Sequence, residues 1–238
     1  MVTSYKPLND VFFCPEESNF YSQSLETLVL NHCNGSEVIV EFGSGDGSPV
    51  INSLLKTTFE GSIHGFELNT SAYKLAKANI EEYNLSKKYI IHNQSFFDSS
   101  NIKADYLISN PPYLPAADQN IYQPLLHGGA DGSNIARQLL SLDYKNVLLM
   151  LSSYSNPEGL INYAKSKGYY IPSFIVSPLN FGYYSSDPKV QEMIGHLRKN
   201  NMAFYSKNIY LLAGVLFKKR HSFMVDISTE LVQLMTAL

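Results

Sequence analysis

The most specific chemical pattern in the chain is Asn110-Pro111-Pro112-Tyr113, which directly follows an apolar segment at 104–109. Two consecutive prolines restrict the backbone and favour an extended residue before them. The Asn110 amide oxygen and the Pro111 carbonyl can therefore act as two fixed acceptors, which suits the two hydrogens of an NH2 group. Such a cradle aims the nitrogen lone pair and stabilises positive charge growing on nitrogen. Tyr113 adds a flat face that excludes water, so Asn110, Pro111 and Tyr113 are the catalytic candidates.

A second pattern, Glu41-Phe42-Gly43-Ser44-Gly45-Asp46-Gly47, lies 65 residues upstream, counted from Gly45 to Asn110. Glycine at every second position permits positive φ and lets a ligand approach the backbone closely. Taken alone, the pattern is equally consistent with a glycine-rich turn that has no ligand.

Three features favour a bound cofactor at this turn. The spacing G-x-G-x-G differs from the dinucleotide spacing G-x-G-x-x-G, and there is no Walker lysine. Glu67 ends the next predicted strand 22 residues after Gly45, where a carboxylate can accept both hydrogens of a ribose diol. The negative charge of Glu41 favours a ligand that carries an amine and a cationic sulfur over a ligand that carries a pyrophosphate. The expected cofactor is S-adenosyl-L-methionine, held by Glu41, Gly43, Ser44, Gly45, Glu67, Leu68 and Asn110.

The adenine pocket is expected from Ser95 and Phe96, which follow the third predicted strand. Ser95 can donate or accept a hydrogen bond, and the Phe96 ring can cover a base. The alternative is a strand end with a core phenylalanine.

Elements that position these residues alternate along the chain. Helices are predicted at 18–32, 48–57, 70–84 (capped by Thr70 or Ser71), 133–142, 157–167, 188–199 and in the tail 219–238. Strands are predicted at 37–42, 62–68, 89–93, 104–109, 146–151, 169–176 and 209–217. The fold class is therefore α/β: a Rossmann-like, seven-stranded sheet, mostly parallel with an antiparallel last strand and helices on both faces. We expect a single domain over 1–238, in which 1–36 covers the cofactor.

The connection between the last two predicted strands, 177–208, is much longer than a hairpin needs. It contains Phe181, Tyr183, Tyr184, Phe204 and Tyr205. Long connections are often lids. We expect this insertion to fold over the methyl-transfer pocket and to put at least one of these rings on its wall, with Phe181, Tyr183 and Tyr184 as substrate candidates. A structural flap or a dimer contact is the alternative.

The motifs resemble those of a known family. E-x-G-x-G-x-G and Glu67 match the first two motifs of class I methyltransferases, and N-P-P-Y matches the fourth motif of amino- and amide-methylating enzymes. The run 110–140, with Gly128-Gly129-Ala130-Asp131-Gly132, resembles the release-factor glutamine N5-methyltransferase family. Pro15-Glu16-Glu17-Ser18 resembles a segment that packs over the cofactor in the short archaeal and eukaryotic branch.

This resemblance implies cofactor contacts at Glu41, Gly43, Gly45, Glu67, Asn110 and Pro15, and substrate contacts at Asn110, Pro111 and Tyr113. The chain departs from the family at Glu17 and Ser95, where Asp is usual. We also expect no separate N-terminal helical domain of the bacterial type.

Composition sets further limits. The net charge of −3 argues against a dedicated nucleic-acid binder. No apolar run is long enough for a bilayer, and the start MVTSYKPLND does not resemble a signal peptide. The two cysteines and six histidines have no metal-ligand spacing, so we expect no metal. The small number of cysteines suits a reducing compartment, so we expect a cytoplasmic location. His127, beside Gly128, is a substrate candidate, although a structural role for it is more common.

Two substrate classes stay open. A small amine, amide or guanidine-type metabolite is favoured by the aromatic insertion, and a protein glutamine on a release-factor-like partner is the alternative. A nucleic-acid base and a non-catalytic binding module are weaker alternatives. The oligomeric state is not indicated.

Overall fold

A computed structural model describes residues 11–99, 102–219 and 224–238 of the chain. Seven strands form one mixed sheet in the order β3-β2-β1-β4-β5-β7-β6. The strands are β1 (Val38–Phe42), β2 (Ser62–Phe66), β3 (Tyr89–His92), β4 (Tyr106–Ser109), β5 (Asn146–Ser152), β6 (Tyr169–Asn180) and β7 (Ile209–Lys219). The pairs β1–β2, β1–β4 and β2–β3 are parallel, whereas β6–β7 is antiparallel. The predicted fold class is confirmed.

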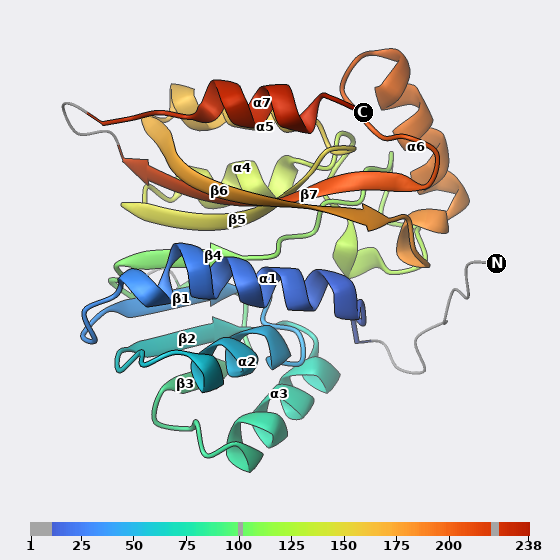
Figure 1. Cartoon of the computed structure of the whole chain (residues 1–238). Coiled ribbons are helices and arrows are strands. Elements are labelled where there is room, and N and C mark those ends of the chain that lie inside the picture. The colour runs from blue at the N-terminus through green and yellow to red at the C-terminus, as the bar shows by residue number, and fades with distance from the viewer. Residues whose placement is uncertain (1–10, 100–101, 220–223) are drawn as a thin grey trace. The chain divides into compact units, whose positions relative to one another are not determined.

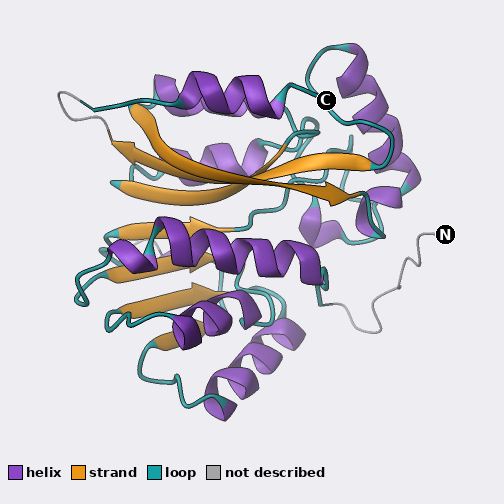
Figure 2. Cartoon of the chain, viewed as in Figure 1, coloured by secondary structure: helices purple, strands orange, loops and turns teal. Residues whose placement is uncertain are grey.

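Helices and strands alternate along most of the chain (Figure 2). The α-helices are α1 (Pro15–Leu28), α2 (Ser48–Lys56), α3 (Thr70–Glu82), α4 (Asn134–Ser141), α5 (Pro157–Ser166), α6 (Pro188–Lys199) and α7 (Ser228–Met235). Short 3-10 turns are η1 (Leu30–His32), η2 (Phe97–Ser99), η3 (Pro124–Leu126) and η4 (Tyr184–Ser186).

The chain divides into two compact units, which are described separately below. One unit contains the described residues of 7–110 and 144–148, and the other contains those of 111–143 and 149–238. Strand β5 contributes residues to both units. The single domain over 1–238 stays an expectation. Residues 1–10, which include the start of the expected cofactor cover, lie outside the described part, as do residues 220–223 of the tail.

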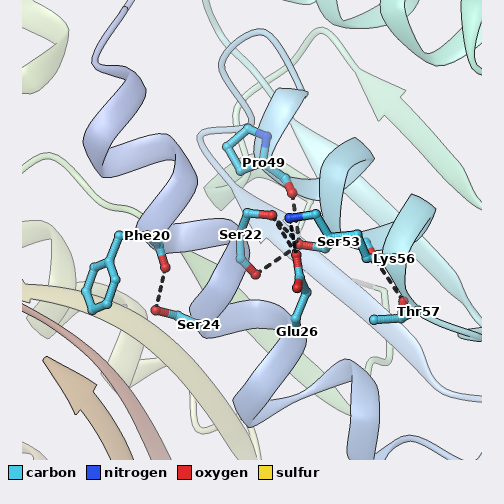
Figure 3. Close-up of polar contacts among 8 residues, drawn as sticks. All are labelled: Phe20, Ser22, Ser24, Glu26, Pro49, Ser53, Lys56 and Thr57. Carbon is cyan, nitrogen blue, oxygen red and sulfur yellow. Dashed lines mark hydrogen bonds and ion pairs between the residues drawn. The ribbon is translucent and has the colours of Figure 1, made fainter. Parts of the chain in front are cut away.

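In the unit built on 7–110, the centres of the parallel strands are apolar and buried, as Ile39, Val40, Ile63 and Leu107 illustrate. Burial on both faces is typical of parallel strands covered by helices. Helices α1 and α2 lie side by side (Figure 1). Figure 3 shows the polar part of their contact, in which the Ser22 and Ser53 hydroxyls are 2.9 Å apart and Lys56 pairs with Glu26 at 3.3 Å.

In the other unit, β6 and β7 form a long antiparallel pair whose register runs from Tyr169↔Lys219 to Asn180↔Ile209 (Figure 1). Helix α7 packs on α5 and β6. Its Leu231 and Met235 are fully buried, whereas Leu234 and Leu238 are 42% and 38% exposed. The sequence predicts one apolar stripe of Ile227, Leu231, Leu234 and Leu238, and this prediction was wrong for Leu234 and Leu238.

Several element boundaries differ from the sequence-based predictions by a few residues, and three of these differences concern α1, α3 and β6. Helix α1 begins at Pro15 because proline is favoured in a first helical turn, where its missing N–H is not needed. The cap of α3 is Asn69, whose side chain accepts from the Ser71 and Ala72 N–H groups, so the predicted Thr70 or Ser71 cap was wrong. Strand β6 continues to Asn180, so the insertion comprises 181–208 rather than 177–208.

Candidate active site

The glycine turn leaves β1 and enters α2 with three glycines in the left-handed region: Gly43 (φ +72°), Gly45 (φ +57°) and Gly47 (φ +76°). A side chain would be strained at these angles. A Cβ added at Gly43 or Gly45 would meet no other atom of the described residues within 4 Å, so open space lies beside this backbone. The turn therefore combines exposed backbone with room for a ligand.

Glu67, just after β2, holds this turn through backbone N–H groups. Its Oε2 accepts from the Gly45 N–H at 2.8 Å, and its Oε1 accepts from the Asn69 N–H at 2.7 Å. Burial raises the pKa of the Glu67 carboxyl, while these N–H donors act in the opposite direction. Each oxygen of the carboxylate keeps a further lone pair, so Glu67 can also accept hydrogen bonds from a diol.

Glu41 differs from Glu67 in its surroundings. Only 1% of Glu41 is exposed, and its two oxygens accept from the hydroxyls of Tyr21 (3.2 Å) and Tyr89 (2.5 Å). Burial raises the pKa of Glu41 to about 7, opposed by the hydrogen bonds from Tyr89 and Tyr21. The carboxylate is therefore inside the fold beneath the turn.

The predicted adenine residue Phe96 packs in a group of phenylalanines. Its ring meets Phe66 edge-on at 5.2 Å and Phe42 edge-on at 5.9 Å, and only 5% of it is exposed. Phe97, which sequence reasoning did not select, lies against Phe42 at 5.4 Å and is 36% exposed. Of the two phenylalanines, Phe97 thus has more surface to offer a base.

The other predicted cofactor residues vary in exposure. Leu68 is 61% exposed, and Pro15 is exposed at the start of α1. Ser44 is 4% exposed, and Ser95 is half-buried. Every predicted cofactor residue, Asn110 included, lies in the unit built on 7–110.

Asn110, which follows β4, carries a buried polar atom that the fold does not use. Its Oδ1 is buried and has no hydrogen-bond partner among residues 11–99, 102–219 and 224–238. Leaving a buried acceptor unpaired costs about 1–3 kcal/mol, so such atoms in native proteins call for an explanation. An acceptor reserved for the NH2 group of a substrate is the explanation that the sequence predicts.

Tyr113, in the other unit, is fixed by the loop Gly128–Gly132. A Cβ at Gly128 would lie 2.7 Å from the Tyr113 Cα, and one at Gly132 would lie 2.5 Å from the Tyr113 carbonyl oxygen. That carbonyl accepts from the Ser155 hydroxyl at 2.7 Å. Both glycines are therefore needed for the loop to pack directly on the backbone of the N-P-P-Y segment.

Asp131 ties the same loop to the segment after β5. It accepts from the Asn156 side chain at 2.6 Å and from the Ser133 hydroxyl at 2.7 Å. Burial acts to raise the pKa of Asp131, but its hydrogen bonds to Asn156 and Ser133 and the charge of Arg137 together lower it. His127 lies with its Nε2 2.9 Å from the Ala116 carbonyl, which is the contact of a ring N–H that braces the loop. The substrate role of His127 stays a prediction.

The insertion packs on the N-P-P-Y tyrosine through an intermediate ring. Tyr113 meets Tyr154 at 5.8 Å between ring centroids, and Tyr154 meets Phe181 at 5.3 Å. Tyr205 contacts Phe181 edge-on at 5.3 Å. The Phe204 carbonyl accepts from the Ser153 hydroxyl at 2.6 Å. Phe181 thus belongs to the same ring cluster as Tyr113.

Tyr183 and Tyr184 lie in a second cluster of the insertion. Tyr183 stacks on Tyr122 at 5.3 Å, and Tyr184, 9% exposed, meets Tyr183 edge-on. Asp187 caps α6 and also accepts from the Tyr122 N–H at 2.7 Å. These contacts attach the insertion to the loop that follows N-P-P-Y; whether the insertion covers a substrate pocket stays a prediction.

No group of three or more His, Cys, Asp or Glu side chains is arranged to hold a metal within the described ranges. Across the same ranges, none of the helices combines the length and apolarity that a bilayer crossing requires.

Comparison with known proteins identifies the family. Residues 12–132, about half of the chain, match the methyltransferase small domain, and the chain belongs to this family. The matched region contains both the glycine turn and the N-P-P-Y segment. The expected class, a family of class I methyltransferases, is confirmed.

Individual relatives and a solved structure agree with that class. A release factor glutamine methyltransferase of Gloeobacter violaceus is 29% identical over 46% of this chain and 41% of its own length. A tRNA1(Val) (adenine(37)-N6)-methyltransferase of Pasteurella multocida is 31% identical over 34% of this chain and 35% of its own length. The chain thus spans less than half the length of these curated relatives.

The ribosomal protein L11 methylase of Lactobacillus delbrueckii subsp. bulgaricus has the same fold, with a TM-score of 0.54 and 11% identity over 91% of each chain.

Proposed function

We propose that this chain is an S-adenosylmethionine-dependent N-methyltransferase that acts on the NH2 group of a planar amide or amine. The observation that supports this most directly is the buried Asn110 Oδ1, which has no hydrogen-bond partner within the described ranges. An amide oxygen next to a rigid Pro-Pro pair accepts a hydrogen from the reacting nitrogen and keeps its lone pair free.

The residues of the glycine turn fit S-adenosylmethionine. Gly43 and Gly45 leave open space beside their backbone, and Glu67 presents a carboxylate anchored by two N–H groups at the end of β2. Glu67 would accept the ribose hydroxyls, and Leu68 and Phe97 offer exposed apolar surface for the base. When bound, this cofactor supplies an electrophilic methyl group on a cationic sulfur.

The chain's own residues then orient the acceptor. Asn110 Oδ1 accepts one hydrogen of the substrate nitrogen, and the Pro111 carbonyl accepts the other. Both acceptors stabilise the positive charge that develops on nitrogen during transfer. A proton leaves the nitrogen after transfer, so no general base is needed at the reacting atom. Tyr113 excludes water beside the acceptor.

The substrate expected from the sequence is a small amine, amide or guanidine-type metabolite. Its support is the insertion, whose Phe181 packs on Tyr154, the ring that packs on Tyr113. A glutamine side chain in a protein is the second candidate, because the relative from Gloeobacter violaceus acts on a release factor glutamine. Both substrates present an NH2 group with two hydrogens to the same acceptors.

The test supplies the purified chain with S-adenosylmethionine labelled in its methyl group and three separate acceptors: a metabolite extract, a release factor, and total tRNA. A release factor with its acceptor glutamine replaced by glutamate is the matched control, because glutamate has no NH2 group. We expect label on nitrogen in one of the first two mixtures, located by mass spectrometry. Label on oxygen or carbon would overturn the proposal, and label in tRNA alone would replace both substrate candidates with a nucleic-acid base.

A further inference from the structure

Glu41 lies at the centre of a buried cluster that joins three elements of one unit. Glu41 itself is on β1, Tyr21 comes from α1, and Tyr89 comes from β3. All three are nearly inaccessible, with 1%, 3% and 1% exposure respectively. Because each carboxylate oxygen accepts one phenol hydrogen, neutral hydroxyl donors compensate the buried charge.

The Tyr89 ring also supports the glycine turn by direct contact. A Cβ at Gly47, the last glycine of the turn, would lie 3.3 Å from Tyr89 Cε1. A Cβ at Gly65, on β2, would lie 2.9 Å from Tyr89 Cε2 and 2.4 Å from the Ser44 hydroxyl oxygen. The ring therefore fits against backbone on two sides, and its hydroxyl reaches Glu41 from there.

This arrangement differs from a carboxylate that binds a cofactor amine directly. Burial and the two phenol hydrogen bonds leave little of Glu41 for contact with a bound molecule. Glu67 has the opposite character, because its partners are N–H groups of the turn itself and of the residue that caps α3.

We propose that Tyr89, assisted by Tyr21, is a positioning residue for the cofactor: it holds Glu41 as a carboxylate inside the fold, and Glu41 acts by fixing the glycine turn. This inference rests on the proposed cofactor site and extends it to two tyrosines. Tyr89 makes the shorter hydrogen bond and touches the turn, so it has the larger effect of the two.

The proposal predicts a dependence of cofactor affinity on pH. When Glu41 takes up a proton, its O–H becomes a donor, and one phenol must stop donating to it. The groups facing Glu41 are the Tyr21 and Tyr89 hydroxyls and Ser44; over a longer range, the charge of Glu67 acts on Glu41 and that of Asp46 acts on Tyr89. Since the pKa of Glu41 is about 7, cofactor affinity falls as pH decreases through that region.

The experiment measures binding of S-adenosyl-L-homocysteine by calorimetry from pH 5.5 to 8.5, with no methyl acceptor present. Tyr89→Phe removes the shorter hydrogen bond and keeps the ring, so we expect roughly tenfold weaker binding at pH 7. We also expect the midpoint of the pH profile to move upward, because the carboxylate has lost its best donor. Tyr21→Phe has a smaller effect in the same direction.

Controls separate positioning from general destabilisation. Tyr83→Phe alters a tyrosine that is 49% exposed, and it leaves affinity and midpoint unchanged. Glu41→Gln removes the titration near pH 7, whereas the contribution of Glu67 stays.

An unchanged affinity and midpoint in Tyr89→Phe would overturn the proposal. So would an equal loss at every pH, since that is what a merely structural role predicts. If the wild-type chain did not bind S-adenosyl-L-homocysteine at all, the proposed function itself would fail. Binding without methyl transfer to any acceptor would leave the inference intact.

Discussion

At the scale of single residues, two carboxylates beside one turn are stabilised in different ways. Glu41 is compensated by side-chain hydroxyls from distant elements, and Glu67 by N–H groups close to the turn. Asn110 differs from both carboxylates, because its side-chain oxygen is buried and has no hydrogen-bond partner among the described residues. A fold keeps an uncompensated acceptor of this kind where a ligand supplies the missing donor.

Asn110→Ala should abolish most turnover and leave cofactor binding much less affected. The lost contact is with the reacting nitrogen, and it is strongest in the transition state, so the effect falls on the chemical step. We expect a loss of 2–3 kcal/mol in transition-state stabilisation, on the order of a hundredfold in rate. Single-turnover kinetics check this, and a wild-type rate in the variant would exclude the acceptor role.

Glu67→Gln should weaken cofactor binding by roughly 1.5–3 kcal/mol, because the amide nitrogen cannot accept from the Gly45 N–H or from a ribose hydroxyl. Calorimetry with S-adenosyl-L-homocysteine measures the change. Glu82→Gln, on the exposed side of α3, is the matched control and should bind as wild type does. Equal affinities of Glu67→Gln and the control would remove Glu67 from the site.

Glu41→Gln should change how stability depends on pH. The folded pKa of about 7 lies above the ordinary value of 4.5, so between these pH values the folded chain keeps a proton that the unfolded chain has lost. The free energy of unfolding therefore decreases as pH rises through this window, by roughly 1 kcal/mol per pH unit from this group. Urea unfolding at pH 5, 6, 7 and 8 should give a flatter curve for Glu41→Gln; parallel curves for the two proteins would contradict the assignment.

At the scale of elements, the N-P-P-Y segment depends on two others for its position. The loop 128–132 packs on the backbone of the N-P-P-Y segment. The segment 153–156 binds both: Ser155 donates to the Tyr113 carbonyl, and Asn156 donates to Asp131 of the loop. The same segment also binds the insertion, because the Asn156 N–H donates to the Met202 carbonyl. A change in the insertion can therefore reach Tyr113 through a few hydrogen bonds and rings.

Gly132→Ala should reduce turnover while cofactor affinity stays near wild type. The added methyl group would lie 2.5 Å from the Tyr113 carbonyl oxygen, so the catalytic segment must shift. Gly168→Ala is a matched control, since Gly168 has nearly the same φ (+79° against +78°) and open space around it. Both variants carry about 1–2 kcal/mol of left-handed strain, and only Gly132→Ala adds the clash. Equal kcat values for the two variants would show that the loop does not position Tyr113.

At the scale of the whole molecule, the sequence predicted the features that a short contiguous run of residues encodes. The alternating pattern gave the seven strands, and the glycine turn and N-P-P-Y were recognisable because each is one contiguous run. Tyr21 and Tyr89 were missed because they are 20 and 48 residues from Glu41, and a buried tyrosine has no pattern that distinguishes it from a core residue. Asn156 directly precedes the helix predicted at 157–167, but its bond to Asp131 depends on tertiary packing and was not predicted.

The predicted cofactor contacts and most of the predicted substrate contacts also lie in different units. The residues expected to bind the cofactor lie in 7–110, and Tyr113, His127 and the insertion rings lie in the other unit. A ligand stabilises what it binds by RT ln(1 + [L]/Kd), about 2.7 kcal/mol at a hundredfold excess over Kd. Saturating S-adenosyl-L-homocysteine should therefore slow hydrogen exchange by up to roughly a hundredfold in 43–47 and 67–69, with much less effect in 181–205.

Adding the methyl acceptor should then slow exchange in the second unit. If the acceptor is a small metabolite, protection in the insertion centres on Phe181, whose ring belongs to the Tyr113 cluster. A folded protein that presents a glutamine covers more surface, so protection would extend to exposed Tyr122 and Leu125 as well. Exchange measured by mass spectrometry on peptides from both units distinguishes these cases. Equal slowing of both units by the cofactor alone would contradict the separate placement of the two binding functions.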